Sequence, residues 1–281
     1  MRRETKQSDG EVIRRTIDAV TRAFPFHGYM EPMRDAYEAI SANCLRLLRP
    51  GSTILDFGAG PCDKAAVLSS LGHECTAIDD LSDDWHQIQG NREKIMDFAG
   101  AHNVKLIVSD VLPSDLPKTF FAMVMMHDVI EHFADSPRSL LLALIELLQP
   151  EGFLYITAPN AANLRKRLLI LTGRTNYPRY PAYFWSGKVW RGHKREYVKD
   201  DLAQLCKFLG LELVLLKGQH HRLRALPAWS RGLFRATLGR IDSLRDTVAL
   251  IAQKPRDWKP PSIGADEYRQ IQRAESFYAF D

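Results

Sequence analysis

The sequence lacks any apolar run approaching the ~20 residues that a membrane-spanning helix requires, so no such helix is expected. Its first twelve residues, MRRETKQSDGEV, also lack the apolar core of a secretory signal. Cysteine is scarce, and the four that are present (Cys44, Cys62, Cys75 and Cys206) form no CxxC pair. This pattern indicates free thiols in a reducing compartment. Together these absences favour a cytoplasmic protein.

The remaining composition is that of an ordinary folded protein, with 45% hydrophobic and 26% charged residues. A chain of 281 residues is long enough to bury a full α/β core as one domain with elaborations. We expect a helical cap over residues 1–50 and a main domain over 51–254. Insertions are expected at about 160–198 and 219–245, and a C-terminal tail or dimer arm over 255–281.

Hydrophobic periodicity predicts the elements of secondary structure. Helices are expected at 11–24, 33–48, 64–71, 83–100, 136–148, 163–171 and 200–209, after a frayed segment at 1–10. Strands are expected at 53–57, 75–78, 104–109, 120–126, 152–160, 211–217 and 247–252.

The stretch TILDFGAGPCDKAAVLSSLGHECTAIDD at 53–80 predicts a strand, a glycine turn, a helix and a second parallel strand. Ligands of open α/β sheets bind at the carboxyl ends of such strands. Gly58 and Gly60 allow a tight turn and a close approach of a ligand, because they have no Cβ. Asp79, about 20 residues further on, is placed to accept hydrogen bonds from both hydroxyls of a ribose.

The acids near this turn distinguish two classes of ligand. The dinucleotide fingerprint needs a third glycine at position 63, where this chain has Asp63, and a carboxylate there would repel a pyrophosphate. Asp56, two residues before the first glycine, suits a cationic ligand group. The residues therefore favour a ligand with an ammonium, a carboxylate and a ribose but no phosphate.

Further segments follow in order along the chain: VSDVLP at 108–113, FAMVMMHDVIEHFADSP at 121–137, LLQPEGFLYITAPN at 147–160 and HKREY at 193–197. With ILDFGAG and AIDD they resemble the motifs of the class I S-adenosylmethionine (SAM)-dependent methyltransferases, and the HxREY match is similar to that of bacterial small-molecule methyltransferases. The resemblance covers residues 35–254. It implies an α/β fold, a Rossmann-like doubly wound seven-stranded sheet that is mostly parallel, with an antiparallel last strand inserted between its neighbours. One departure is Cys62, which stands where many members have a third glycine.

The resemblance also implies SAM as the cofactor and assigns residues to it. They are Asp56, Gly58, Gly60, Asp79, Asp80, Asp110, Val111 and His127. Asp110 would accept a hydrogen bond from the adenine amino group, because a carboxylate accepts and does not donate. No metal is required by methyl transfer from a sulfonium, and the sequence shows no recognisable divalent-ion cluster near the cleft. Asp128 and Glu131 are the one opening for such a site.

Catalytic candidates come from HDVIEH, which follows an apolar run typical of a central strand. Glu131 and His132 match the Glu-His pair of many relatives, and His193 belongs to the HxREY match. A histidine with a near-neutral pKa could take a proton from a hydroxyl as the methyl group arrives. The alternative is that the pair supports the loop through hydrogen bonds.

The acceptor side is predicted to follow residue 160, where a long loop is rich in aromatic and basic residues. We expect substrate contacts from Asn160, Tyr183, Trp185, Arg195 and Tyr197. Asn160 is not part of the NPPY-type signature of amino-directed methylation, which favours oxygen as the acceptor atom.

Basic residues are concentrated in the same half of the chain. Positions 160–245 hold 18 Lys and Arg against 5 Asp and Glu, a net charge of +13 that leaves −9 for the rest of a chain whose total is +4. This asymmetry favours an anionic acceptor, or contact of basic amphipathic segments at 163–171 and 222–244 with the inner face of a membrane. A solvated surface is the alternative. Nucleic acid is disfavoured as a partner, because no RNA-binding appendage is evident.

The sequence thus leads to one hypothesis and two alternatives. The hypothesis is a SAM-dependent methyltransferase that transfers a methyl group to an oxygen of a small-molecule, glycan or lipid-linked anionic acceptor, with a homodimer as one form of the protein. The first alternative is a methyltransferase-fold binding or scaffold protein without turnover. The second is an NAD-dependent oxidoreductase, which Asp63 disfavours.

Overall fold

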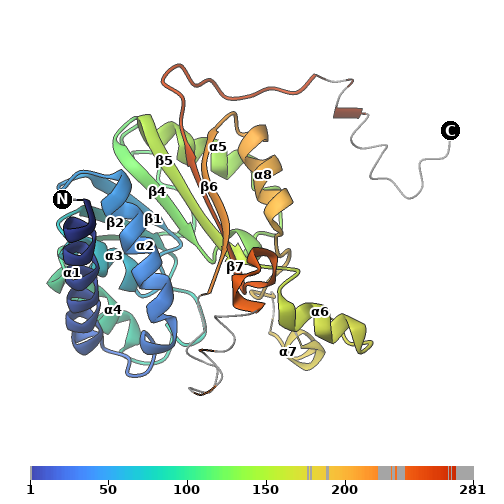
Figure 1. The fold of residues 1–281 in the computed structure, drawn as a ribbon, viewed down its shortest axis with the longest axis horizontal. Coiled ribbons are helices and arrows are strands. Elements are labelled where there is room, and N and C mark those ends of the chain that lie inside the picture. The colour runs from blue at the N-terminus through green and yellow to red at the C-terminus, as the bar shows by residue number, and fades with distance from the viewer. Residues whose placement is uncertain are drawn as a thin grey trace.

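Seven strands form one sheet at the centre of the computed structural model (Figure 1). The structure describes residues 2–175, 177, 179–187, 190–220, 229, 232, 238–264, 266 and 268–269. The strands are β1 (Thr53–Phe57), β2 (Glu74–Asp79), β3 (Lys105–Val108), β4 (Phe121–His127), β5 (Leu148–Pro159), β6 (Glu212–Gln219) and β7 (Thr247–Gln253). Their order is β3-β2-β1-β4-β5-β7-β6. Only β7 runs antiparallel to its neighbours β5 and β6, which confirms the predicted sheet.

Helices lie on both faces of this sheet and beyond one of its ends. They are α1 (Arg2–Ala23), α2 (Arg34–Leu47), α3 (Asp63–Ser70), α4 (Asn91–Ala101), α5 (Arg138–Leu147), α6 (Leu164–Leu171), α7 (Tyr180–Phe184) and α8 (Lys199–Phe208). Short 3-10 turns are η1 (Glu31–Met33), η2 (Ile130–His132), η4 (Leu238–Arg240) and η5 (Asp242–Leu244). Figure 1 shows α6 and α7 beyond one end of the sheet.

Alternating strand side chains divide the interior into two hydrophobic cores. In β4, Met123 and Met125 pack into a core shared with α1 to α4, while Val124 and Met126 pack into a core shared with α5 and α8. Successive strand residues point to opposite faces, so a strand covered on both sides is apolar throughout. This explains the uninterrupted apolar run in β4.

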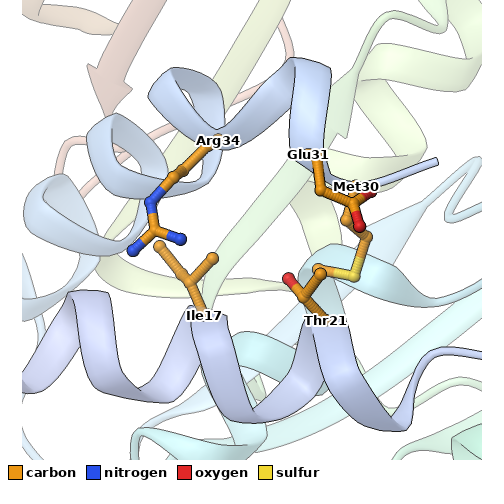
Figure 2. A pocket seen from close by; sticks show the side chains of 5 residues that line it. All are labelled: Ile17, Thr21, Met30, Glu31 and Arg34. Carbon is orange, nitrogen blue, oxygen red and sulfur yellow. The ribbon is translucent and has the colours of Figure 1, made fainter. Parts of the chain in front are cut away.

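The two N-terminal helices form a cap over the first of these cores. Ile17 of α1 is buried, and Arg34 at the start of α2 forms an ion pair with Asp18 of α1. Figure 2 shows the Arg34 guanidinium near Ile17, beside a hollow lined by Ile17, Thr21, Met30, Glu31 and Arg34. The hollow lies between the cap helices and not at the carboxyl ends of the strands.

Three predicted boundaries are wrong. α1 begins at Arg2 rather than near residue 11, in a segment of mostly good helix formers. The helix expected at 83–100 begins only at Asn91, because Gly90 before it has φ 81, a left-handed conformation outside the helix. β5 begins at Leu148 rather than at 152, with a register shift opposite Phe121 and Met123.

Ordered packing continues slightly past the end of β7. Lys254 Nζ donates hydrogen bonds to Ile145 O at 2.8 Å and Leu148 O at 2.7 Å. Trp258 Nε1 donates to Leu209 O at 2.8 Å. The basic segment expected at 222–244 lies outside the described residues except for 229, 232 and 238–244. Among the described residues no helix is long and apolar enough to cross a membrane.

Candidate functional site

The glycine turn after β1 is bonded to the carboxyl end of β2. Gly58 N and Ala59 N both donate to Ile78 O, at 2.8 and 3.1 Å. Gly58 has φ 72 and Gly60 has φ 54, conformations that L side chains rarely adopt. A Cβ on Gly58 would also lie 2.5 Å from a Val129 methyl carbon. Position 58 therefore requires glycine on two separate grounds.

Asp79 holds the turn from the end of β2. Its Oδ2 accepts a hydrogen bond from Gly60 N at 2.7 Å, and its Oδ1 accepts one from Leu81 N at 2.8 Å. Burial raises the pKa of Asp79, although these two amide hydrogen bonds oppose the shift. The structure therefore places the predicted ribose-binding carboxylate directly against the glycine turn.

Asp56 lies inside the turn at the end of β1 and is only 1% exposed. Its Oδ2 has no hydrogen-bond partner among the described residues. Burial raises the pKa of Asp56 to about 7. Cys62, which stands at the place of the third glycine, keeps a left-handed conformation with φ 63 and caps α3. Cys62 therefore adopts a left-handed backbone conformation of the kind that glycine adopts readily.

Sequence reasoning missed Lys64. A lysine in the first turn of a helix is unfavourable to the helix dipole, and this signal could have pointed to it. Lys64 Nζ lies 3.6 Å from Asp63 Oδ2, and Asp63 also accepts a hydrogen bond from Tyr37 of α2. Burial works to lower the pKa of Lys64, but Asp63, Tyr29 and Asp56 outweigh it and raise the pKa. Lys64 therefore stays a cation beside the glycine turn.

Asp80 connects the carboxyl end of β2 to the loop that follows α7. Arg191 Nη2 donates to both of its oxygens, at 3.2 and 3.0 Å, and Arg191 Nε lies 3.4 Å from Asp83 Oδ1. Burial works to raise the pKa of Asp80, but hydrogen bonds from Ser82 and then Arg191 hold the pKa below its usual value. The loop that carries His193 therefore reaches the carboxylates of Asp80 and Asp83 after β2.

The other three predicted cofactor residues differ in exposure. Asp110 and Val111 follow β3 and are exposed at the same edge of the sheet. His127 at the end of β4 is buried, with Nδ1 3.1 Å from Thr157 Oγ1 and its ring edge-on to Tyr155. His127 thus packs in the protein interior against Thr157 and Tyr155 of β5, whereas Asp110 and Val111 are exposed.

Glu131, His132 and His193 form one cluster, although 61 residues separate the last two. Glu131 in η2 is completely buried, and its Oε1 lies 3.9 Å from Nε2 of each histidine. Lys194 N donates to Glu131 O at 2.7 Å, which fixes the loop against η2. Burial, and then the charge of Asp128, raises the pKa of Glu131 to about 8.

Two further residues support this cluster. Glu196 Oε1 lies 2.8 Å from His193 Nδ1, and the other carboxylate oxygen pairs with Lys166 of α6. Burial, and then Arg165, lowers the pKa of Lys166 to about 8. The basic helix α6 is thereby linked to the cluster.

The predicted substrate residues separate into two groups. Tyr183 and Trp185 are exposed on and just after α7, with Trp185 80% exposed. The Tyr183 ring lies 5.5 Å from that of Trp190, whose Nε1 donates to His193 O at 3.3 Å. The exposed Tyr183 ring is therefore connected through Trp190 to the loop that carries His193.

Asn160, Arg195 and Tyr197 instead hold this loop to the sheet. Asn160 is 3% exposed, and its Nδ2 donates to Ser243 O at 3.0 Å and Arg245 O at 2.8 Å. Asn160 and Tyr197 pair through an isolated bridge, and the Arg195 guanidinium lies 5.7 Å from the centre of the Tyr197 ring. The Asn160 side-chain amide already donates hydrogen bonds to backbone carbonyls, so Asn160 is not included in the proposed acceptor site.

Comparisons with known proteins agree with this geometry. A family model described as a methyltransferase domain matches residues 28–216. No curated protein matches the sequence. A SAM-dependent methyltransferase from Archaeoglobus fulgidus is 18% identical with a TM-score of 0.52, over 80% of this chain and 98% of that one. A methyltransferase in complex with the Haloferax volcanii Trm112 methyltransferase activator is 14% identical with a TM-score of 0.54, over 88% and 99%.

A third solved structure is phosphoethanolamine N-methyltransferase 2 of Haemonchus contortus in complex with SAM. It is 15% identical with a TM-score of 0.50, over 85% of this chain and 56% of that one. At these identities the solved structures show a shared fold, whereas the family model covers more than half of the chain. The chain therefore belongs to the methyltransferase-domain family and has the fold of the class I SAM-dependent methyltransferases.

Proposed function

We propose that this protein binds SAM at the glycine turn and transfers its methyl group to an oxygen of a small-molecule, glycan or lipid-linked anionic acceptor. The observation that carries the proposal is Asp79, whose carboxylate is held against Gly60 at the end of β2. Asp56 and Lys64 add a buried carboxylate and a cation at the same turn. These charges complement the ammonium and the carboxylate of the methionine part of SAM.

Methyl transfer from a sulfonium is an in-line displacement in which a positive charge is neutralised. The protein aligns the acceptor oxygen with the methyl carbon and excludes water. The acceptor hydroxyl must also lose its proton. The cluster of Glu131, His132 and His193 lies at the end of β4, next to β1, and is suited to that step.

The basic half of the chain supports an anionic acceptor. Arg165, Lys166 and Arg167 follow one another on α6. A phosphate or carboxylate on the acceptor would be attracted to this surface. Membrane contact through the basic segments and a homodimer through the C-terminal segment remain predictions.

Two measurements separate the proposal from its alternatives. Calorimetry with SAM and with NAD tests the ligand class, and we expect heat of binding from SAM alone. Acceptor-dependent release of S-adenosylhomocysteine tests turnover, and a scaffold protein would release none with any acceptor. An untargeted metabolite screen with a labelled methyl donor would supply the acceptor for this assay.

Asp79→Ala is expected to weaken SAM binding about 10–100-fold, since hydrogen bonds to a charged group contribute about 1.5–3 kcal/mol. Isothermal titration of the purified variant measures this. Asp97→Ala, which removes an exposed carboxylate from α4, is the matched control and should bind as the wild type does. An unchanged dissociation constant for Asp79→Ala would remove Asp79 from the cofactor site.

SAM affinity is expected to rise about tenfold between pH 6 and pH 8. The pKa of Asp56 is raised to about 7, so about one-tenth of its carboxyl groups are ionised at pH 6 and about nine-tenths at pH 8. A cationic ligand prefers the ionised form, so affinity increases with pH and levels off above this range. Asp56→Asn should lose this part of the pH dependence while keeping the titration of the ligand itself. Parallel profiles for the two proteins would contradict a role for Asp56.

A further inference from the structure

Glu131, His132 and His193 have a geometry that general-base catalysis does not require. Each offers one ligand atom, a carboxylate oxygen or an imidazole nitrogen, and these atoms all lie within 4.8 Å of one another. Glu131 Oε1 is 3.9 Å from both Nε2 atoms, which is too far for a hydrogen bond. Two ligands at about 2.0–2.2 Å from a tetrahedral ion lie about 3.3–3.6 Å apart. Small side-chain rotations would therefore close the three atoms around one ion.

The carboxylate of Glu131 provides independent support. It is 0% exposed, and neither of its oxygens accepts a hydrogen bond from another described residue. A buried carboxylate without a donor is unfavourable unless a cation compensates for it. Oε1 of Glu131 lies near both imidazoles, at 3.9 Å from each Nε2, and receives no hydrogen bond from them. A metal ion between these groups would satisfy the carboxylate.

The hydrogen bonds of the two histidines orient the required nitrogen atoms. His132 Nδ1 lies 2.6 Å from Arg191 O, and His193 Nδ1 lies 2.8 Å from Glu196 Oε1. Carbonyl and carboxylate oxygens only accept, so each Nδ1 carries a proton and Nε2 is the atom on the side of Glu131. Metal-binding histidines are oriented in this way by a carbonyl or a carboxylate. Lys166 pairs with Glu196 and keeps that carboxylate in place.

From this geometry we infer that Glu131, His132 and His193 bind a divalent transition-metal ion such as Zn²⁺. Two imidazoles and one carboxylate favour this class of ion over Mg²⁺ and Ca²⁺, which prefer oxygen ligands. Three protein ligands leave one tetrahedral position open, as in catalytic zinc sites. The proposed site differs from the expectation from sequence that no metal would bind, and its third ligand comes from a loop distant in sequence.

The consequence for catalysis rests on the proposed function. The open position would take the acceptor hydroxyl, whose pKa falls on binding to a metal ion, and its proton would leave to solvent. The oxygen would then form a bond to the methyl carbon as the sulfur–methyl bond breaks. The electron pair of that bond stays on sulfur, and S-adenosylhomocysteine is released. In this scheme the two histidines act as ligands rather than as proton acceptors.

Zinc binding can be measured on the full-length chain, prepared without a histidine tag, stripped with a chelator and dialysed. Titration with zinc chloride should give one ion per chain. Glu131→Gln and His193→Ala should each weaken binding about 100-fold or more, and Glu196→Gln about 10–100-fold through the orientation of His193. His27→Ala removes an exposed histidine of the cap and should have no effect. The four cysteines are buried and do not offer a competing surface site.

Two results would overturn the metal site: less than one zinc ion per chain, or the same zinc affinity in the wild type and in His193→Ala. His193 lies on a loop, so its variant should keep the wild-type melting temperature, and the measurement stays decisive if Glu131→Gln fails to fold. SAM binding is measured on the same zinc-free preparation. If the protein binds SAM but does not bind zinc, the metal site is rejected and the proposed function stands. If it binds zinc but does not bind SAM, the metal site stands and the proposed function is rejected.

Discussion

Simultaneous replacement of Tyr180, Tyr183 and Trp185 with serine is expected to lower kcat/KM for the acceptor about 100-fold or more. These rings are exposed on and next to α7. The Tyr183 ring contacts that of Trp190, whose Nε1 donates a hydrogen bond to His193 O. Burying a large apolar side chain contributes about 1.5–3 kcal/mol, so loss of three contacts to a bound acceptor exceeds two orders of magnitude. SAM affinity should stay within about threefold of the wild-type value, because the side chains assigned to the cofactor lie elsewhere. The free energy of unfolding should change little, since each exposed substitution usually shifts it by less than about 0.5 kcal/mol.

The matched control for this variant is Phe208→Ser, which removes an exposed ring from α8. It should leave acceptor turnover and SAM binding at wild-type values. An unchanged kcat/KM in the triple variant would show that the α7 rings are surface residues without a part in recognition. An equal loss of SAM binding and of turnover would instead place α7 in the cofactor site.

Gly58→Ala is expected to lower the free energy of unfolding by about 2–5 kcal/mol. The left-handed φ of 72 accounts for about 1–2 kcal/mol of this cost for an L residue. The new Cβ would also meet the Val129 side chain at 2.5 Å, and overpacking of this kind costs about 1–3 kcal/mol. Urea denaturation monitored by far-ultraviolet circular dichroism measures the change.

Gly60→Ala separates the two causes. Gly60 has a similar left-handed φ of 54, but nothing lies within 4 Å of the Cβ that it would gain. The expected loss is therefore only the conformational part, about 1–2 kcal/mol. The double variant Gly58→Ala/Val129→Ala should recover part of the stability lost by Gly58→Ala alone. Equal losses for Gly58→Ala and Gly60→Ala would show that contact with Val129 has no effect.

The fold could be predicted because local and long-range signals agree. The apolar run in β4 indicates a central strand, and the turn at Gly58 and Gly60 indicates a parallel connection from β1 to β2. Element ends were less predictable, since they depend on single backbone conformations. Gly90 is the clearest case, because its left-handed φ of 81 delays α4 by eight residues relative to the predicted start at 83.

The candidate site was only partly predictable, because sequence patterns locate strand ends but not contacts between distant loops. Asp79 was predicted from its spacing to the glycines, and the structure places it against Gly60. The contact of His193 with Glu131 depends on how a loop folds back onto η2, which no local pattern specifies. Asn160 was assigned to the acceptor site because it follows a strand. In the structure its side-chain amide donates a hydrogen bond to the backbone carbonyl of Ser243 in η5.

The central claim is that the glycine turn after β1, which contains Gly58 and Gly60, binds SAM. A crystal structure of the full-length protein grown with saturating SAM tests it most directly. We expect density for the nucleoside at the carboxyl ends of β1 and β2, with both ribose hydroxyls hydrogen-bonded to the Asp79 carboxylate. An empty turn at saturating SAM, or density for a pyrophosphate on the amides of Gly58 and Gly60 when NAD is supplied instead, would contradict the account.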